Sequence, residues 1–389
     1  MKTGLMRLLE KPRTLLRSAR VGLVANPTTV TASLDHAAPL LAAHPEVNLT
    51  HLFGPEHGLY GVAQDMIDVA DARDAWTGLP VHSLYGAEES SLSPRAEALK
   101  DLDTLVFDIQ DIGSRYYTYA ATMALCMSAA ARAKIKVLVL DRPNPLNGVT
   151  VEGGGLASDL RSFVGLYPVP QRHGMTVGEL ARLYNTAFGI GCELEVLTCE
   201  GWDRSIYFDG TGLPWVTPSP NMPTLETAIV YPGMCLLEGT NLSEGRGTTR
   251  PFELFGAPFV DSRALAEELG RFDLPGVSFR PCFFKPTFHK WEGQVCGGLQ
   301  LHVVDRESFA SYRTGLAVLT AVRRLWPEDL RWRTDTYEFR HDVPAIDLLT
   351  GSTEVREAID RGSPFDEVMA KALVGAESFP GARESVLLY

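Results

Sequence analysis

The sequence predicts a two-domain α/β protein in which a parallel sheet, covered by helices on both faces, precedes a smaller α+β domain. Three observations support this prediction. At 389 residues the chain exceeds the usual limit for one hydrophobic core. Short runs of β-branched residues alternate with helical stretches in its first half, which is typical of parallel sheets. Near residue 202 the composition changes, and a differently patterned region follows.

The first region contains near-continuous apolar runs of strand length, each separated from the next by a longer stretch. Strands are expected over residues 21–26, 47–53, 79–85, 103–108, 136–140 and 193–198. Helices are expected over residues 33–43, 117–133 and 176–188. Thr176 is a suitable cap for the last of these helices, because Glu179 follows three residues later.

Residues 202–259 are rich in Gly, Pro, Asn and Thr and contain few long apolar runs. A loop region of this length is uncommon unless it is functional. Beyond it, strands are expected over residues 277–284 and 295–304, and helices over 308–325 and 353–373. We therefore predict a first domain over residues 1–250 and an auxiliary domain over residues 251–389, with the long loop region at their junction.

The composition excludes several classes of protein. A hydrophobic content of 45% with 22% charged residues is that of an ordinary globular protein. The net charge of -12 argues against a nucleic-acid partner, because phosphate binding needs a surplus of Lys and Arg. The six cysteines form no CxxC pair, so we expect buried thiols in place of a zinc cage or a disulfide framework.

The first 20 residues are partly basic but lack the apolar run of roughly 7–15 residues that a secretory signal needs. No later run reaches the roughly 18 apolar residues that suggest a membrane span. We expect a cytoplasmic protein without a membrane partner, or a secreted or periplasmic one if the start is trimmed. The sequence leaves the oligomeric state open.

Polar residues follow four of the predicted strands at their carboxyl ends. These residues are Asn26, Glu56, Asp108 and Asp141. In open α/β sheets, ligands bind outside the carboxyl ends of the strands, where the strand order reverses. One polar residue after a strand is common in loops, but four of them in one sheet favour a ligand-binding site.

Glu56 lies in the segment Gly54-Pro55-Glu56-His57-Gly58. Pro55 restricts the backbone of this segment, and the two glycines allow backbone conformations that other residues disfavour. The segment is suited to holding a carboxylate and an imidazole in one direction. Glu is a general acid when burial raises its pKa, and His57 is an alternative proton carrier. The competing interpretation is a tight turn with a surface glutamate.

The segment from Phe107 to Tyr119 places two acids, Asp108 and Asp111, beside Arg115 and three tyrosines after a strand. Tyrosines such as Tyr116 offer flat faces with a hydroxyl tip that suit a sugar ring, and Arg115 is suited to a carboxylate. A metal site formed by Asp108, Asp111 and His57 is an alternative, although the spacing of these residues is not diagnostic of a metal-binding motif. Alternatively, this segment caps a helix and contributes aromatic side chains to the core.

Two later segments combine polar groups with small residues. The segment 218–223 is stiff and displays Asn221, whereas residues 237–250 alternate acids and arginines with small residues that let a ligand approach. A mobile surface loop is the competing interpretation of the second segment. His173 precedes a predicted helix start, where an anion is readily received, although a single histidine is more often structural.

Several expected motifs are absent. The sequence contains no GxGxxG after the first strand and no GxxxxGK[ST], which disfavours dinucleotide and ATP binding. It also contains no GxSxG, which disfavours an esterase-type serine nucleophile. We therefore predict no cofactor and no metal.

As a set, the motifs resemble the NamZ-type exo-β-N-acetylmuramidase family. The resemblance rests on six blocks that occur in order, any one of which is weak alone. They are GPEHG (54–58), FDIQDIGSRYY (107–117), DRPNPL (141–146), RHGMT (172–176), SPNMP (219–223) and EGTNLSEGRGT (238–248). The resemblance implies a Rossmann-like domain, a smaller auxiliary domain and an active cleft between them.

The resemblance also implies release of terminal N-acetylmuramic acid from the non-reducing end of peptidoglycan fragments, such as muropeptides. Glu56 matches the family's candidate catalytic acid, and the remaining roles follow from chemistry. Some members carry a secretion signal, whereas the sequence given shows none, which suggests either recycling of internalised fragments or a trimmed or misannotated start.

We hypothesise that Glu56 is the general acid and is tuned by His57 or by a nearby carboxylate. Asp108, Glu238 or Glu244 would be the second carboxylate, and Arg115 or Arg246 would pair with the lactyl carboxylate of the sugar. The further candidates for substrate contact are Asn26, Tyr116, Asp141, Asn144, His173, Asn221 and Asn241. A separation of about 5–5.5 Å between the carboxylates implies retention, and roughly 6.5–9.5 Å implies inversion. The acetamido group of the substrate is an alternative nucleophile.

Three other functions remain open at this point. One is a noncatalytic sugar- or muropeptide-binding protein, which needs aromatic platforms and arginine but no carboxylate with a raised pKa. Another is a metal-dependent hydrolase that uses Asp108, Asp111 and His57. A nicotinamide-dependent enzyme is the most distant, because the glycine motif is missing.

Overall fold

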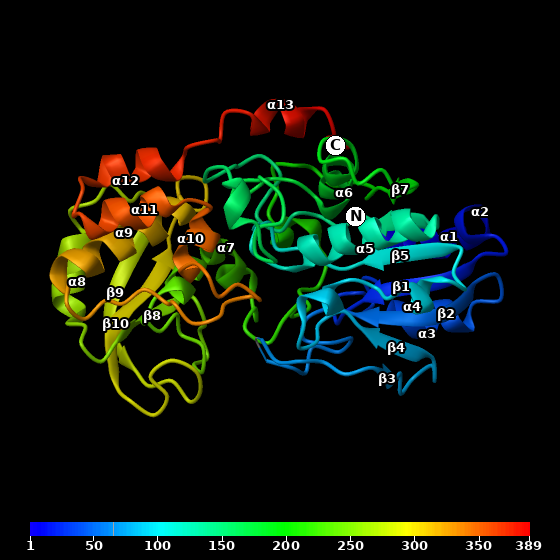
Figure 1. Cartoon of the computed structure of the whole chain (residues 1–389), viewed down its shortest axis with the longest axis horizontal. Coiled ribbons are helices and arrows are strands. Elements are labelled where there is room, and N and C mark those ends of the chain that lie inside the picture. Colours follow the sequence, from blue (N-terminus) through cyan, green and yellow to red (C-terminus); the bar gives the residue numbers. More distant parts are fainter. Residues whose placement is uncertain (65) are drawn as a thin grey trace.

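The computed structural model describes residues 1–64 and 66–389. They form two lobes that lie side by side, a β-sheet lobe from the first half of the chain and a smaller lobe from the second (Figure 1). A hydrophobic cluster runs without interruption from strand and helix residues of the first lobe, such as Phe107 and Met123, to Leu316 of the second. The lobes therefore share one continuous apolar core.

The first lobe contains a seven-stranded sheet with the order β3-β4-β2-β1-β5-β6-β7. All neighbouring strands pair in parallel except β3 and β4. Its strands are β1 (Arg20–Ala25), β2 (Asn48–Gly54), β3 (Ala72–Arg73), β4 (Pro80–Ser83), β5 (Thr104–Asp108), β6 (Lys136–Leu140) and β7 (Leu194–Leu197). The prediction of an α/β fold with a parallel sheet is thus confirmed, and the strand order reverses at β1, between β2 and β5.

Helices cover both faces of this sheet (Figure 1). They are α1 (Gly4–Glu10), α2 (Pro12–Leu16), α3 (Ala37–Ala43), α4 (Ala96–Leu99), α5 (Tyr119–Ala133) and α6 (Val177–Thr186), with 3-10 turns η1 (Glu89–Leu92), η2 (Ser158–Leu160) and η3 (Phe208–Thr211). The predicted cap of α6 is confirmed, because Thr176 and Glu179 form a reciprocal capping box. The predicted start of α3 at residue 33 is wrong, since His36 caps this helix.

The second lobe is built on a three-stranded antiparallel sheet with the order β8-β10-β9. Its strands are β8 (Leu254–Ala257), β9 (Val277–Phe284) and β10 (Cys296–Val303). Its helices are α7 (Leu225–Met234), α8 (Ser262–Leu269), α9 (Ser311–Leu325), α10 (Ala345–Thr350), α11 (Thr353–Asp360) and α12 (Phe365–Ala372), with the 3-10 turn η4 (Cys235–Gly239) after α7. The α+β character predicted for the auxiliary domain is confirmed.

Two expectations for this half are wrong. The predicted loop region over residues 202–259 contains α7, η4 and β8. The helix predicted over residues 353–373 is two helices, α11 and α12, because Gly362 has a φ of 68° and Pro364, the N-cap of the second helix, interrupts the pattern.

Helix α7 packs against α9 of the second lobe. Gly233 and Gly315 meet at this crossing so closely that a Cβ on either would lie 2.1 Å or less from backbone oxygen of the other helix. The chain therefore enters the second lobe at α7, before the domain boundary that we predict between residues 250 and 251; that boundary stays a prediction.

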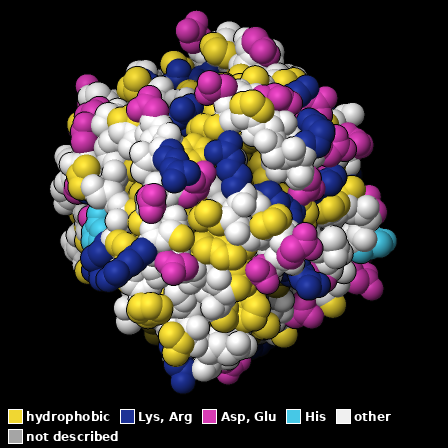
Figure 2. Space-filling view, turned by 90° about the vertical axis from the view of Figure 1, so that its left-hand side faces the viewer, with side chains coloured by type: hydrophobic (Ala, Val, Ile, Leu, Met, Phe, Trp, Pro, Cys, Tyr) yellow, Lys and Arg dark blue, Asp and Glu magenta, His cyan; other side chains and the backbone are white. Residues whose placement is uncertain are grey.

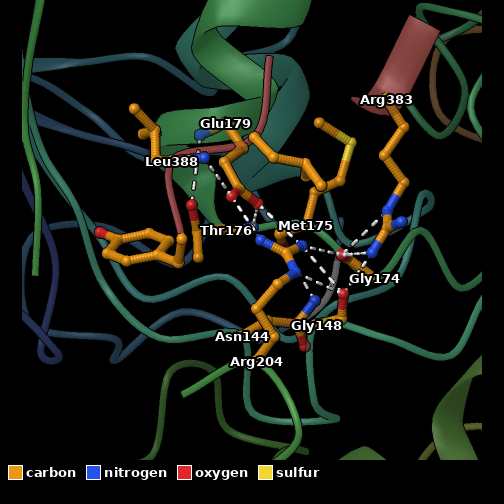
Figure 3. A network of polar contacts seen from close by, with 12 residues as sticks. Asn144, Gly148, Gly174, Met175, Thr176, Glu179, Arg204, Arg383 and Leu388 are labelled. Carbon is orange, nitrogen blue, oxygen red and sulfur yellow. Dashed lines mark hydrogen bonds and ion pairs between the residues drawn. The ribbon is translucent and has the colours of Figure 1, made fainter. Parts of the chain in front are cut away.

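The end of the chain returns to the first lobe. Helix α13 (Phe379–Glu384) crosses from one lobe to the other along the top of Figure 1. Arg383 donates to the carbonyls of Gly148 and Gly174, and Glu179 accepts from the backbone nitrogen of Leu388 at 2.9 Å (Figure 3). We call residues 379–389 the C-terminal clasp.

The outer face of the second lobe carries interspersed basic and acidic side chains around an apolar centre (Figure 2). The six cysteines are unpaired, and Cys282 is half-buried while the other five are buried. Within residues 1–64 and 66–389, no helix has both the length and the apolarity that crossing a bilayer requires.

Candidate functional site

A cleft lies where the carboxyl ends of β2 and β5 meet the second lobe. It is lined by Glu56, His57, Tyr116, Tyr117, Thr118, Tyr119, Val164, Ser219, Asn221, Met222, Tyr231, Glu238, Arg246, Phe252, Tyr337 and Glu338. Both lobes therefore contribute side chains to one cleft.

Glu56 stands in a strained turn directly after β2. His57 has a φ of 70° and Gly58 a φ of 81°, so two successive residues adopt left-handed backbone. Such strain in a residue other than glycine is a feature of functional sites. The turn buries Glu56, which is 4% exposed and accepts a hydrogen bond from the Thr118 hydroxyl at 2.8 Å.

His57 is oriented by the same turn. Its Nδ1 lies 3.0 Å from the carbonyl oxygen of Ala63, which only accepts hydrogen bonds. The Nδ1 atom therefore carries a proton, and a neutral ring leaves Nε2 as an acceptor.

Aromatic rings form a large part of the wall. Tyr231 contacts Tyr116, Tyr117 and Phe252 edge to face, with ring centroids 6.0, 5.8 and 4.8 Å apart respectively. Burial raises the pKa of each of the three tyrosines well above its usual value, so their hydroxyls stay protonated. The wall therefore combines closely packed aromatic rings with protonated hydroxyl groups, residue types that are also found in sugar-binding sites.

The opposite side of the cleft holds a buried charge network. Nη2 of Arg246 donates to Oε1 of Glu238 at 2.7 Å, and its Nε lies 3.5 Å from Oε1 of Glu244. The guanidinium also lies over the Phe252 ring, 5.2 Å from its centroid. Oε2 of Glu238 accepts from the Tyr337 hydroxyl at 2.7 Å.

The tip of the β9–β10 hairpin, residues 285–295, supports this network from behind. Nζ of Lys290 donates to Glu244 at 2.9 Å and to the carbonyls of Leu237 and Leu242 at 3.0 and 3.1 Å. Nδ1 of His289 lies 3.2 Å from Glu244. Burial opposes the ionisation of Glu244, but Lys290, His289 and Arg246 outweigh it and lower the pKa of this carboxyl well below its usual value. Glu244 is therefore an anion that helps to hold Arg246.

Six residues singled out in the sequence line the cleft: Glu56, His57, Tyr116, Asn221, Glu238 and Arg246. They come from four separate blocks of sequence. The fold thus brings together much of what the motifs suggest, although their individual roles stay predictions.

Three of the charged residues predicted to contact substrate form ion pairs or hydrogen bonds with other groups of the protein. Glu244 lies behind Arg246, and Asp108 forms a buried two-pronged ion pair with Arg142 at 2.6 and 2.9 Å. Arg115 is buried, which lowers the pKa of its guanidinium, and it donates to the carbonyls of Gly155, Val169 and Leu349. Arg115 therefore holds loops together, and Arg246 is the cation that faces the cleft.

Five polar candidates also bond to neighbouring loops and helices: Asn26, Asp141, Asn144, His173 and Asn241. Asp141 accepts from the backbone nitrogen of Gly178 at 2.7 Å and from the Tyr389 hydroxyl at 2.6 Å. Burial raises the pKa of Asp141 to about 6 despite these bonds. Its position at the carboxyl end of β6 serves the C-terminal clasp.

The three residues considered for a metal site are dispersed. Asp108 pairs with Arg142, and Asp111 lies 3.2 Å from His173, whereas His57 lines the cleft. Throughout the described part of the chain, no three His, Cys, Asp or Glu side chains are grouped so that they could hold a metal ion.

Sequence reasoning missed four lining residues that the second lobe contributes: Tyr231, Phe252, Tyr337 and Glu338. Tyr231 and Phe252 lie in the stretch interpreted as a long loop. Tyr337 and Glu338 stand between two predicted elements, where no motif distinguishes them. The adjacent aromatic and acidic side chains, Tyr-Glu-Phe, were the available signal.

Comparison with known proteins gives a consistent result over the whole chain. Residues 21–226 match the family described as exo-β-N-acetylmuramidase NamZ, N-terminal, and residues 229–389 match its C-terminal counterpart. The chain is 45% identical over 388 residues to the peptidoglycan β-N-acetylmuramidase NamZ of Bacillus subtilis (strain 168), covering 100% of this chain and 91% of that protein.

Two crystal structures of DUF1343 family proteins from Bacteroides fragilis NCTC 9343 share the fold. One superposes with a TM-score of 0.90 at 37% identity, and the other with a TM-score of 0.77 at 29% identity. Each alignment covers 100% of this chain and 98% of the other.

Proposed function

The chain belongs to the NamZ family of exo-β-N-acetylmuramidases, and from that premise we propose that Glu56 drives its hydrolysis of peptidoglycan fragments as general acid. The protein is a glycoside hydrolase that releases N-acetylmuramic acid from the non-reducing end of its substrate. The observation that carries the assignment is a relative that is 45% identical over 100% of this chain and 91% of its own length and is named for this activity.

Glu56 is suited to protonate the glycosidic oxygen as the bond to the anomeric carbon breaks. The residue is 4% exposed yet lines the cleft, so its carboxyl is shielded from bulk water and open to substrate. Thr118 fixes one carboxyl oxygen, and the strained turn at His57 fixes the backbone. A positioned acid of this kind contributes about 10²–10⁴-fold to the rate.

Arg246 is our candidate partner for the lactyl carboxylate that distinguishes N-acetylmuramic acid from N-acetylglucosamine. Among the described residues that line the cleft, it is the one Arg or Lys side chain. A guanidinium pairs readily with a planar carboxylate. Glu238 and Phe252 hold the group in place from two directions.

A role in cell-wall recycling, a cytoplasmic location and acceptance of peptide-bearing muropeptides stay predictions from the sequence. Separating cell fractions and probing each for the protein tests the location. Incubation with intact muropeptides tests the peptide tolerance.

Incubation with the disaccharide N-acetylmuramic acid–N-acetylglucosamine tests the function directly. We expect equal amounts of the two free sugars by chromatography with mass detection, and full activity in excess chelator. Tight calorimetric binding of the disaccharide without any release would instead identify a noncatalytic binding protein. Loss of activity with the chelator would indicate a metal-dependent hydrolase.

A further inference from the structure

The turn that carries Glu338 is unusual in its sequence. Tyr337 and Arg340 pair through two backbone hydrogen bonds of 2.9 and 3.0 Å, and the two residues between them have positive φ, 45° for Glu338 and 67° for Phe339. This is the pattern of a type I′ turn, whose central positions are normally Asn-Gly or Asp-Gly. Here the central residues are Glu and Phe, whose side chains disfavour a positive φ.

The side chains of the strained turn face the protein. Glu338 is 5% exposed and lines the cleft. Its Oε2 accepts from the Tyr85 hydroxyl at 3.2 Å, and the Phe339 ring packs edge to face on Tyr85 with centroids 5.7 Å apart. The strained turn therefore places the carboxylate of Glu338, a residue of the second lobe, in the cleft. There it forms a hydrogen bond with Tyr85 of the first lobe.

The turn is also anchored across the lobes. Nη1 of Arg340 donates to the carbonyl of Arg161 at 2.7 Å, and Nη2 donates to that of Asp159 at 3.1 Å. These bonds tie the turn to the first lobe, so Glu338 is held relative to Glu56, which the first lobe carries. Strained residues that are fixed by their surroundings cluster at active sites.

The carboxylates that the sequence suggests as partners of Glu56 each have another role in the structure. Asp108 pairs with Arg142 and does not line the cleft, and Glu244 pairs with Lys290 at 2.9 Å. Glu238 lines the cleft, but Arg246 holds one of its oxygens and Tyr337 the other. Glu238 is therefore suited to position Arg246.

We propose that Glu338 is the second catalytic carboxylate and accepts a proton from the water that attacks the anomeric carbon. This inference rests on the proposed function. As the bond from the anomeric carbon to the glycosidic oxygen breaks, Glu56 transfers its proton to that oxygen. The oxygen of water bonds to the same carbon, and one proton of this water passes to Glu338. Glu56 ends ionised and Glu338 protonated, and proton exchange with solvent restores both.

The test is the pH dependence of kcat/KM for chromogenic N-acetylmuramide hydrolysis by Glu338→Gln. We expect kcat to fall by roughly 10²–10⁴-fold with little change in KM, and the acidic limb of the profile to disappear. A second variant, Tyr85→Phe, removes a hydrogen bond to the ionised carboxylate, which raises the pKa of Glu338. In that variant the acidic limb is retained and moves to higher pH.

Glu328→Gln is the matched control, because Glu328 is an exposed glutamate of the same lobe outside the cleft, and we expect wild-type kinetics from it. An acidic limb that persists unchanged in both Glu338→Gln and Tyr85→Phe would overturn the proposal. Disaccharide cleavage by the wild-type protein is measured in parallel. If the wild type cleaves the disaccharide and the pH profiles of both variants match that of the wild type, the role of Glu338 is refuted and the proposed function stands. If the wild type does not cleave the disaccharide, the proposed function itself is refuted.

Discussion

Arg246 is the residue whose surroundings define its role most narrowly. It is buried between two glutamates and lies over the Phe252 ring, yet it also lines the cleft. A guanidinium held from several sides loses little conformational freedom when a ligand carboxylate arrives. Its environment therefore suits recognition of an anionic sugar substituent.

Replacing Arg246 with Met tests this recognition. A hydrogen bond to a charged group contributes about 1.5–3 kcal/mol, so we expect kcat/KM for an N-acetylmuramide to fall roughly 10- to 100-fold. Hydrolysis of the matching N-acetylglucosaminide lacks that bond and should fall much less. The measured quantity is the ratio of the two kcat/KM values. Arg250→Met, at a half-exposed arginine four residues on, is the control. An equal loss on both substrates would show that Arg246 acts only through the fold.

At the scale of elements, the hairpin tip between β9 and β10 determines where the charge network stands. Lys290 binds carbonyls of η4 and of the segment after it as well as Glu244. Trp291 adds a hydrogen bond of 2.6 Å from its Nε1 to the carbonyl of Asn241. The tip thus fixes both ends of the segment that carries Glu238 and Glu244.

Lys290→Met should lower the free energy of unfolding by about 3 kcal/mol, because it leaves Glu244 buried without its closest cation. The folded-state pKa of Glu244 lies below its usual value, so the stability it contributes is present at neutral pH. That contribution is lost as the pH falls below about 4, and the difference between variant and wild type should shrink there. Denaturant unfolding at several pH values measures both effects.

Lys285→Met provides the matched control on the same hairpin, because Lys285 is exposed. It should unfold like the wild type. Adding Glu244→Gln to Lys290→Met removes the unpaired charge and should recover part of the lost stability. A Lys290→Met protein that is as stable as the wild type would refute the role of the hairpin tip.

The elements that sequence patterns predicted correctly are those with a clear periodicity and clear ends. Strands β1, β2, β5 and β6 are apolar runs of strand length that are followed by polar residues, and α6 carries its capping box. Helix α7 was missed because nearly all of its residues are buried, which leaves no polar face, and because Pro232 lies inside it. Tertiary packing, which the local sequence does not display, stabilises such a helix.

At the scale of the whole molecule, the cleft depends on how the two lobes are joined. The apolar core is continuous between them, and the C-terminal clasp returns from the second lobe to Asp141 and Glu179 of the first. The carboxyl ends of the strands predicted half of the cleft, because parallel strands place their following loops along one edge. The other half comes from residues such as Tyr337 and Glu338, whose positions depend on the packing of the second lobe.

The most direct test of Glu56 as the acid in this cleft uses a series of aryl N-acetylmuramides whose leaving groups differ in acidity. Glu56→Gln should hydrolyse the poorest leaving groups roughly 10²–10⁴-fold more slowly than the wild type and the best ones at a similar rate. Its rate should therefore depend steeply on the pKa of the leaving group, whereas the wild-type rate should depend on it weakly. Equal dependence in the two proteins would contradict protonation of the leaving group by Glu56.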